Sequence, residues 1–531
     1  MKSGRFVRCS VAVALLLAML LTLAAARPAA AATIVVDGVT CTLADAITAA
    51  NNDTATGGCP AGGGADTLDL VADITLTSRL PAIVSEVTLL GNGHTIQRLP
   101  ASPAFRILEI GYPARVSIDA VTITGGEDDA GGGISAESVL WLLITNSTIE
   151  DNAANSGGGV YCMQCYLFMS RSIVRNNSAT YSGGGIRFYF YKPTDETRVV
   201  DQLQTPENSY CGLGYSTGIT ESSITGNSAQ IGGGLSYHGS SFSVEGSTIS
   251  DNTAITGGGL SNYRGGGCID STTFSGNTAS EKGGALYNES FALKNEAVGL
   301  NPLAILAAEH DTVHHGSFET PDWGGFLDLS NSTIVNNSGP LGAGLYTLHV
   351  GPPYPAFIGR VEPLNTIMAA QTSGADCVSE NGALVISQGY NIESTTSCGF
   401  TATGDQQNVS AAQLNLAPLA DNGGPTWTHA LTPNSPAIDQ GNCPIATADQ
   451  RGYPRPIDQI GVPNAADGCD VGAFELQIPT AVNTVEFAAV DRTTRSPVSY
   501  WVVVALLAAL LLATGVRIGR RRSENDGQIE V

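Results

Sequence analysis

Apolar residues recur along this chain in short runs of three to five, separated by glycine or asparagine. The runs belong to one repeated phrase, which reads ESSITGNSAQIGGGL from Glu221 and GSTISDNTAITGGGL from Gly246. Related copies start at Asn146, Arg171, Asp270 and Asn331, and a degenerate copy starts at Asp119. The spacing is 25 residues from Asn227 to Asn252 and again to Asn277. A period in the twenties without helical periodicity predicts a solenoid of short strands.

Each repeat has the length of one rung of a parallel β-helix, with three short strands and three turns. The pattern predicts an inward apolar column of Ile149, Ile224, Ile249, Phe274 and Ile334. It also predicts asparagines stacked at one turn, where asparagine tolerates a left-handed backbone and its amide bonds to the next rung. These turn residues are Asn152, Asn176, Asn227, Asn252, Asn277 and Asn337. The glycine triplets are expected to supply positive φ at the sharpest corner.

Both ends of the chain carry targeting patterns. Residues 1–32 combine basic residues, an apolar run and an alanine-rich end, as in a secretory signal peptide. Residues 498–516 are apolar and long enough for a transmembrane helix. Four arginines follow within residues 517–531, the predicted cytoplasmic tail. The sequence therefore predicts an exported, single-pass membrane protein with an extracellular ectodomain and a linker over 477–497.

Composition narrows the classes of partner. Of 531 residues, 63 are glycine, 14% are charged, and the net charge is -23. An acidic chain without clustered basic residues excludes nucleic acid as a partner. No cofactor motif is present. Ca²⁺ is the one candidate ion, because an acidic surface can hold cations.

Eleven cysteines fit an oxidising compartment. Ten lie beyond the predicted signal peptide, and local spacing predicts three bridges, Cys41–Cys59, Cys377–Cys398 and Cys443–Cys469. The pairing of Cys162, Cys165, Cys211 and Cys268 stays open among three alternatives. Cys162 and Cys165 also form a CxxC spacing, but the absence of a second such pair disfavours a zinc or redox site.

Two insertions interrupt the repeats, over 187–218 and 288–326. The first contains Phe188, Tyr189, Phe190 and Tyr191, which predict either an aromatic platform for a glycan or an extended strand that buries two rings. The second contains Trp323, a further candidate ligand contact. It also holds His310 and His314 at i, i+4, a spacing that fits metal binding on a helix, with a solvated polar loop as the alternative.

The repeats resemble right-handed parallel β-helices of the pectin-lyase-like superfamily. The segments FSGN from Phe274 and GGAL from Gly283 also resemble the repeats of bacterial polymorphic membrane proteins, a family linked to adhesion. CTLADAITAANN from Cys41 resembles the CSLREA domain, with Ala44 and Asp45 in place of its arginine and glutamate. LAPLADNGGPTWTHALTPNSPAIDQG from Leu416 is similar to the choice-of-anchor Q domain.

These resemblances imply an organisation and a fold class. The implied fold is an all-β, right-handed parallel β-helix with a short helical N-terminal cap, a C-terminal capping module and one transmembrane helix. The expected order is an N-terminal cap over 33–90, a β-helix over 91–400 and a C-terminal module over 401–476.

Three functions are compatible with this organisation. The first is a cell-surface binding or adhesion module for a polysaccharide or another surface polymer. The second is a polysaccharide lyase or glycoside hydrolase, but the carboxylate, histidine and arginine sets of such enzymes are not visible together. The third is a passive envelope spacer. We predict no catalytic residue, because a fold alone does not specify a reaction.

Overall fold

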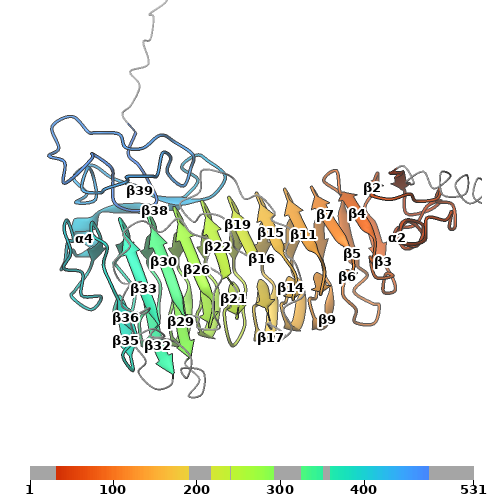
Figure 1. The fold of residues 1–531 in the computed structure, drawn as a ribbon, viewed down its shortest axis with the longest axis horizontal. Coiled ribbons are helices and arrows are strands. Elements are labelled where there is room, and N and C mark those ends of the chain that lie inside the picture. Colours follow the sequence, from red (N-terminus) through yellow and green to blue (C-terminus); the bar gives the residue numbers. More distant parts are fainter. Residues whose placement is uncertain (1–30, 191–216, 240, 292–324, 351–358, 478–531) are drawn as a thin grey trace, which may run out of the picture. The chain divides into compact units, whose positions relative to one another are not determined.

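The computed structural model describes residues 31–190, 217–239, 241–291, 325–350 and 359–477. These residues form a parallel β-helix in which each rung adds one strand to each of three long parallel sheets (Figure 1). Alternate residues of the strands point inward and are buried. The predicted parallel β-helix is therefore confirmed.

Sheet 1 has twelve strands and forms one side of the solenoid. In spatial order these are β1 (Thr33–Val36), β2 (Asp66–Leu70), β4 (Glu86–Leu90), β7 (Arg115–Asp119), β11 (Trp141–Thr145), β15 (Leu167–Ser170), β19 (Thr217–Thr220), β22 (Ser241–Glu245), β26 (Gly266–Asp270), β30 (Phe326–Ser330), β33 (Arg360–Leu364) and β36 (Leu384–Val385).

Sheet 2 has eleven short strands, each of which follows a strand of sheet 1 after a tight turn. They are β3 (Ile74–Leu76), β5 (Thr95–Arg98), β8 (Thr122–Thr124), β12 (Thr148–Glu150), β16 (Ile173–Arg175), β20 (Ser223–Thr225), β23 (Thr248–Ser250), β27 (Thr273–Ser275), β31 (Thr333–Val335), β34 (Ile367–Met368) and β37 (Ile392–Glu393).

Sheet 3 has nine strands and completes the rung. They are β6 (Leu108–Gly111), β10 (Ile134–Glu137), β14 (Val160–Met163), β18 (Ile186–Tyr189), β21 (Leu235–His238), β25 (Leu260–Tyr263), β29 (Leu286–Phe291), β32 (Leu345–Val350) and β35 (Cys377–Glu380). Five short strands lie between sheets 2 and 3 along the chain: β9 (Glu127–Ala130), β13 (Ala153–Ser156), β17 (Ser178–Ser182), β24 (Thr253–Thr256) and β28 (Thr278–Lys282).

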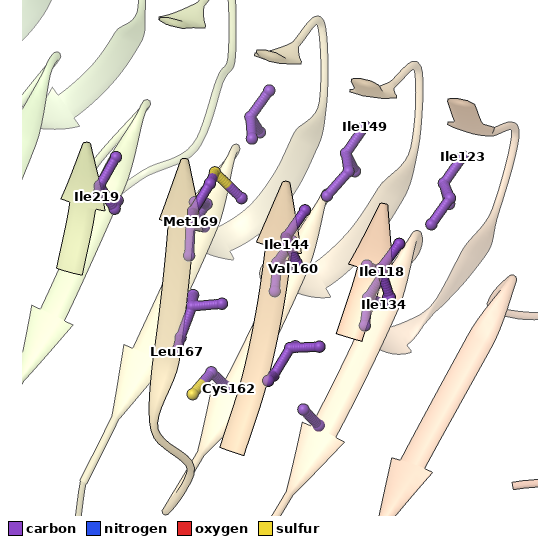
Figure 2. Close-up of a cluster of buried hydrophobic side chains, with 14 of the residues drawn as sticks. Ile118, Ile123, Ile134, Ile144, Ile149, Val160, Cys162, Leu167, Met169 and Ile219 are labelled. Atoms are coloured by element: carbon purple, nitrogen blue, oxygen red, sulfur yellow. The ribbon is translucent and has the colours of Figure 1, made fainter. Parts of the chain in front are cut away.

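The interior is a continuous apolar core because residues in the same position of successive rungs lie directly above one another. Ile224, Ile249, Phe274 and Ile334 are register partners in sheet 2, and each is fully buried. Ile149 occupies the same column two rungs earlier, so the predicted inward column is confirmed. Figure 2 shows this stacking in neighbouring rungs. Sheet 1 contributes Ile118, Ile144 and Met169, and sheet 3 contributes Ile134, Val160 and Cys162.

The turn asparagines form a buried hydrogen-bonded ladder between neighbouring rungs. The backbone N–H of Asn252 and its Nδ2 both donate to Oδ1 of Asn277, at 3.1 and 2.9 Å. The same Nδ2 donates to the carbonyl of Ile224 in the preceding rung, at 2.9 Å. Members of the ladder are Asn152, Asn177, Asn227, Asn252, Asn277 and Asn337.

Two details of the turn differ from the prediction. Asn177 takes the ladder position and Asn176 does not, because the rung repeats at 25 residues there. The left-handed residue is the one before each ladder asparagine, such as Asp251 with φ 56°. The ladder asparagine is thus selected for its amide, while the neighbouring Asp, Asn or Gly absorbs the left-handed backbone.

Residues 33–90 supply both a helical cap and the first strands of sheet 1. Helix α2 (Leu43–Asn52) begins at Thr42, whose side chain accepts the N–H of Asp45, and ends at Asp53 with φ 50°. It buries Leu43 and Ile47 in the same core as the strands. The helix therefore covers the apolar end of the first rung.

The C-terminal module, residues 401–476, contains helix α4 (Ala411–Leu414) and the antiparallel pair β38 (Leu416–Ala420) and β39 (Thr428–Leu431). It lies along the outward face of sheet 2 (Figure 1). Thr248 Oγ1 donates to the carbonyl of Trp427 at 2.6 Å, and Thr273 Oγ1 donates to Oε1 of Gln450 at 2.6 Å. The module is thus hydrogen-bonded to strands far from it in sequence.

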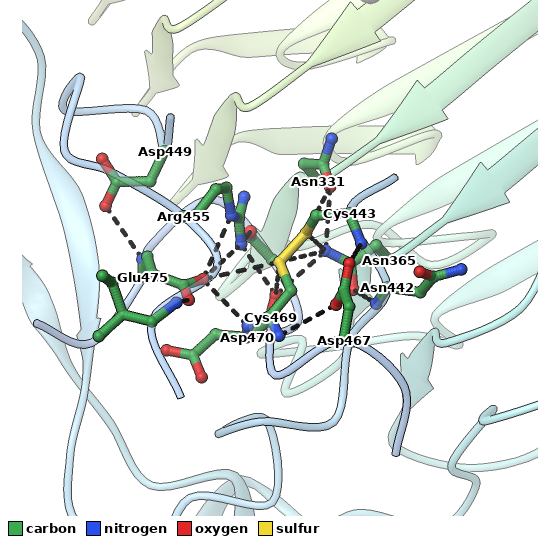
Figure 3. The surroundings of a disulfide bond; sticks show 12 residues. Asn331, Asn365, Asn442, Cys443, Asp449, Arg455, Asp467, Cys469, Asp470 and Glu475 are labelled. Carbon is green, nitrogen blue, oxygen red and sulfur yellow. Dashed lines mark hydrogen bonds and ion pairs between the residues drawn. A yellow bond between two sulfur atoms is a disulfide. The ribbon is translucent and has the colours of Figure 1, made fainter. Parts of the chain in front are cut away.

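A buried polar centre holds this module together (Figure 3). Arg455 pairs with Glu475 at 3.2 Å, and both side chains are fully buried. Arg455 Nη2 also donates to the carbonyls of Asp470 and Gly472. Asn365, which follows β33 of the solenoid, donates to the carbonyl of Asp470 at 3.1 Å and so joins the module to a rung.

Candidate functional site

The outward face of sheet 3 carries an aromatic ladder, which we define as Tyr189, His238 and Tyr263. The three residues are register partners at the fourth position of β18, β21 and β25. Ring centres lie 4.7 Å apart between Tyr189 and His238, and 4.5 Å apart between His238 and Tyr263. Each side chain is half-exposed. Sheet register therefore brings together three rings that are far apart in sequence.

Two guanidinium groups flank the aromatic ladder. The Arg187 guanidinium lies 5.7 Å from the ring centres of both Tyr181 and Tyr189. Arg264 lies 5.0 Å from the ring centre of Tyr263. Cation–π contacts of this kind restrict the conformations of an arginine side chain. Within the described ranges, no carboxylate forms an ion pair with Arg187.

The electrostatics of the ladder are set by these cations. Burial, together with the positive charges of Arg187 and Arg264, lowers the pKa of His238 to about 4. The imidazole is therefore neutral near pH 7. Burial also lowers the pKa of Arg187 from its ordinary value.

A second cluster follows in the next rungs of the same face. The parallel rings of Tyr287 and Tyr346 lie 5.5 Å apart, and their hydroxyls donate to Glu289 and Glu380 respectively. Lys282 Nζ donates to the Tyr346 hydroxyl at 2.8 Å. Burial raises the pKa of both phenols, and the hydrogen bonds to the two glutamates raise it further. This cluster presents acidic groups and one balancing cation.

The glycine triplets explain why large side chains fit at this corner. Gly183 has φ 67°, and a Cβ there would lie 2.6 Å from Cβ of Arg187. Without that Cβ, the chain turns tightly and Arg187 packs back over β17, where it donates to the hydroxyl of Ser182. Glycine at the turn therefore positions the first guanidinium of the site.

The predicted aromatic platform is formed only in part. Phe188 points inward and is fully buried, so it has no surface for a ligand, because strand alternation turns it into the core. Tyr189 faces outward in the ladder, and Phe190 is half-buried against the core. Tyr191 and Trp323 lie outside the described residues. The strand β18 also runs through Tyr189, beyond the predicted start of the first insertion at 187.

The predicted metal ligands His310 and His314 lie outside the described residues. Within the part of the chain that the structure describes, no group of three or more His, Cys, Asp or Glu side chains is placed to hold a metal ion. The structure therefore gives no positive support for Ca²⁺ or another cofactor.

Three disulfides have the predicted pairing, Cys41–Cys59, Cys377–Cys398 and Cys443–Cys469. A fourth joins Cys162 to Cys165 inside the core, which explains their CxxC spacing without a metal. Cys268 is also disulfide-bonded. Cys211 lies outside the described residues.

His238, Tyr263 and both guanidiniums were not predicted as site residues. A signal for the ladder exists in the repeats. After three successive Gly-Gly-Gly-aliphatic phrases, which start at Gly183, Gly232 and Gly257, the third residue is Tyr189, His238 and Tyr263 in turn. Reading it requires knowing that this position faces outward in every rung and that the rungs stay in register.

The predicted transmembrane segment 498–516 lies outside the described residues. In the ranges that are described, no helix is long and apolar enough to cross a membrane.

Comparisons with known proteins give two likenesses. Residues 271–289 match the model of the Chlamydia polymorphic membrane protein repeat. The crystal structure of pectate lyase Pel9A resembles this chain with a TM-score of 0.44 at 10% sequence identity, over 84% of this chain and 96% of that chain. No curated protein matches the sequence.

Proposed function

We propose that this chain is an exported, membrane-anchored β-helix protein of the cell surface that binds an extended polysaccharide along the outward face of sheet 3. The observation that carries the proposal is the aromatic ladder with its two guanidiniums. Successive rungs of a parallel sheet lie about 4.8 Å apart, so the face offers a regular row of polar and aromatic groups. A polymer with a regular repeat suits such a row.

The cellular setting is part of the proposal. The signal peptide over 1–32 and the apolar segment 498–516 support export and a single membrane anchor. The likeness to a repeat of a polymorphic membrane protein supports a surface location. We also propose that residues 33–90 and 401–476 are CSLREA-like and choice-of-anchor Q-like modules. The first closes the N-terminal end of the solenoid, and the second packs on sheet 2.

Hydrolysis of the bound polymer is a second candidate function. Glu289 and Glu380 lie two rungs apart in one column of sheet 3, with Leu348 between them. Their hydrogen bonds to the stacked Tyr287 and Tyr346 draw both carboxylates to the same region of the face. Two carboxylates flanking one bond are the requirement of most glycoside hydrolases.

The test is retention of the full chain, purified in mild detergent, on a panel of acidic and neutral polysaccharides with and without Ca²⁺. Retention without new chain ends is expected. Tyr189→Ala and Tyr263→Ala are expected to weaken retention by about tenfold each, because each removes one aromatic contact. New chain ends that increase with protein concentration and vanish in Glu289→Gln would instead establish hydrolysis.

Phe168→Ala is the matched control. Phe168 is a half-buried, outward-facing aromatic residue on β15 of sheet 1, in the same rung as Tyr189 but on another face. Its loss is expected to leave retention unchanged. Equal losses for Phe168→Ala and Tyr189→Ala would contradict a site on sheet 3, and no retention of any polymer would leave the spacer function.

A further inference from the structure

We propose that the aromatic ladder recognises anionic groups of its polymer through its guanidiniums and the edges of its rings, and not by stacking sugars on ring faces. The inference rests on the proposed function of the same face. The ligand group that it names is an oxyanion, carried at intervals along the polymer. Carboxylate, sulfate and phosphate share that chemistry.

The ring faces of the ladder are already occupied. Tyr189 packs on His238 at 4.7 Å, and His238 packs on Tyr263 at 4.5 Å. Guanidiniums lie 5.7 Å from the ring centre of Tyr189 and 5.0 Å from that of Tyr263. A sugar that stacks on an aromatic ring needs a free face, whereas the half-exposed ladder offers its ring edges. Those edges carry two phenol hydroxyls and the imidazole nitrogens, which are hydrogen-bonding groups.

Arg187 is held ready for an anion. Its guanidinium is fixed by two tyrosine rings and by its hydrogen bond to Ser182 Oγ. A guanidinium whose rotamer is already fixed loses little entropy when it forms paired hydrogen bonds to an oxyanion. Within the described ranges it has no carboxylate ion-pair partner, so a ligand does not have to displace one.

The neutral state of His238 is consistent with a positive local potential. Burial is the main cause that lowers its pKa to about 4, and Arg187 and Arg264 contribute to the same direction. The chain as a whole has a net charge of -23, so this cationic region does not follow from the composition. A local site in an acidic protein should bind polyanions only at close range and with strong salt dependence.

The cluster formed by Tyr287, Tyr346 and their glutamate partners marks the end of the anion site. Glu289 is the register partner of Tyr263 in the next rung, and Glu380 lies two rungs further. Carboxylates there repel an anionic group placed beside them. The polymer's anionic groups are therefore expected opposite β18 to β25, and removal of a glutamate should strengthen binding.

The test uses three polymers that share the dextran backbone and differ in charge, and a fourth polymer that carries phosphate. Dextran, carboxymethyl dextran and dextran sulfate are immobilised, together with poly(glycerol phosphate), and the dissociation constant of the full chain is measured at low and high salt. We expect binding to the charged polymers, at least tenfold weaker binding to dextran, and a loss of at least tenfold between 20 and 200 mM salt. The strongest charged arm identifies carboxylate, sulfate or phosphate as the preferred group.

Variants assign the effect to the ladder. Arg187→Gln is expected to weaken binding to the charged polymers by about 10- to 100-fold, as for loss of a charge-assisted hydrogen bond. Arg187→Lys should retain part of the affinity. Arg264→Gln should also weaken binding to the charged polymers and tests the second guanidinium independently. Glu380→Gln should strengthen binding. Arg171→Gln, which removes an exposed arginine paired with Glu221, is the matched control and should have no effect.

The outcomes separate this inference from the proposed function. Retention of dextran as tight as that of its charged derivatives, lost in Tyr189→Ala but kept in Arg187→Gln, would overturn the inference and leave polysaccharide binding in place. Failure to retain any of the four polymers would contradict both. Unaltered thermal unfolding of each variant shows that a loss of binding does not arise from misfolding.

Discussion

The outward face of sheet 2 is covered by the C-terminal module, whereas the outward face of sheet 3 carries half-exposed rings and charges. On sheet 2, Thr248 and Thr273 are buried beneath the module. Where the module does not reach, Ile173 and Arg175 of the same sheet are exposed. Coverage therefore changes along one sheet, although its backbone geometry does not.

The side chains of the two faces differ accordingly. The covered positions of sheet 2 are small, and the hydroxyls of Thr248, Thr273, Ser275 and Thr333 bond to the module. Many outward positions of sheet 3 instead carry aromatic or charged side chains, and the ladder residues make their contacts with one another. Side chains on sheet 2 are thus explained by packing, while those on sheet 3 are not, and this contrast favours a ligand on sheet 3.

The strongest test of this contrast is to break the buried pair of the module. Glu475→Ala leaves Arg455 as an uncompensated charge in a fully buried site. We expect the free energy of unfolding to fall by about 3–5 kcal/mol. Urea unfolding measures the loss, and polymer binding by the protein that remains folded should be unchanged.

Glu150→Ala is the matched control on the uncovered part of sheet 2. Glu150 pairs with Arg175 at 2.6 Å across neighbouring rungs, and Arg175 is exposed. Because solvent screens such a pair, its loss should cost less than about 1 kcal/mol. Similar costs for Glu475→Ala and Glu150→Ala would contradict a structural role for the buried centre.

The interface between the module and sheet 2 is tested by Gln450→Ala. Gln450 accepts from Thr273 Oγ1 at 2.6 Å, and its Nε2 donates to Thr248 Oγ1 and the carbonyl of Trp427. Its removal leaves buried polar groups without partners, and we expect a loss of about 2–3 kcal/mol. Hydrogen exchange should show opening of β23 and β27 before the rest of the solenoid.

Gln97→Ala provides the comparison for that variant. Gln97 is exposed on β5 of the same sheet and donates to Thr75 Oγ1 at 3.2 Å. Its loss should change stability by no more than about 0.5 kcal/mol. If Gln450→Ala is equally mild, the module does not depend on this contact for its position.

The contrast between the faces also indicates what the sequence could predict. The repeated phrase predicted the solenoid, the apolar column and the asparagine ladder, because each depends on residues about one rung apart. It did not predict that the left-handed residue is Asp251 and not Asn252, since both residue types tolerate that backbone.

Contacts between distant segments lay beyond the pattern. Gln450 and Thr273 are 177 residues apart, and no periodicity links the C-terminal module to sheet 2. The ladder was missed for a related reason, because an insertion separates Tyr189 from His238 and hides their common register. Sequence spacing thus predicts contacts between regular rungs well and contacts across insertions poorly.

The buried carboxylate of Asp470 gives the module a distinct pH dependence. Burial, together with the charge of Glu475, raises the pKa of Asp470 to about 7, above the ordinary value of 3.8. The folded state therefore binds the proton more tightly, so its stabilising effect is complete below pH 3.8 and is lost as the pH rises through 7. We expect about 2 kcal/mol less stability at pH 8 than at pH 4 from this group.

Asp470→Asn should remove that slope, as measured by urea unfolding at intervals from pH 4 to pH 8. The variant keeps the position of the side chain, which accepts the N–H groups of Asp439 and Leu476. An unchanged slope in Asp470→Asn would show that this carboxyl does not hold its proton in the folded protein.

The smallest expected effect has the opposite sign and belongs to sheet 3. Because the pKa of His238 is lowered to about 4 by burial and then by Arg187 and Arg264, the folded state favours the neutral imidazole. Its stabilising effect is complete above the ordinary pKa of 6.5 and is lost as the pH falls from 6.5 to 4. The imidazole is half-exposed and screened by solvent, so we expect the free energy of unfolding to fall by only about 1 kcal/mol.

His238→Gln should remove this loss of stability at low pH, while Asp470→Asn should retain it. Because the two slopes oppose each other between pH 4 and 6.5, the single variants should reveal dependences that partly cancel in the natural chain. A slope that is equal in both variants would mean that the two faces do not titrate independently.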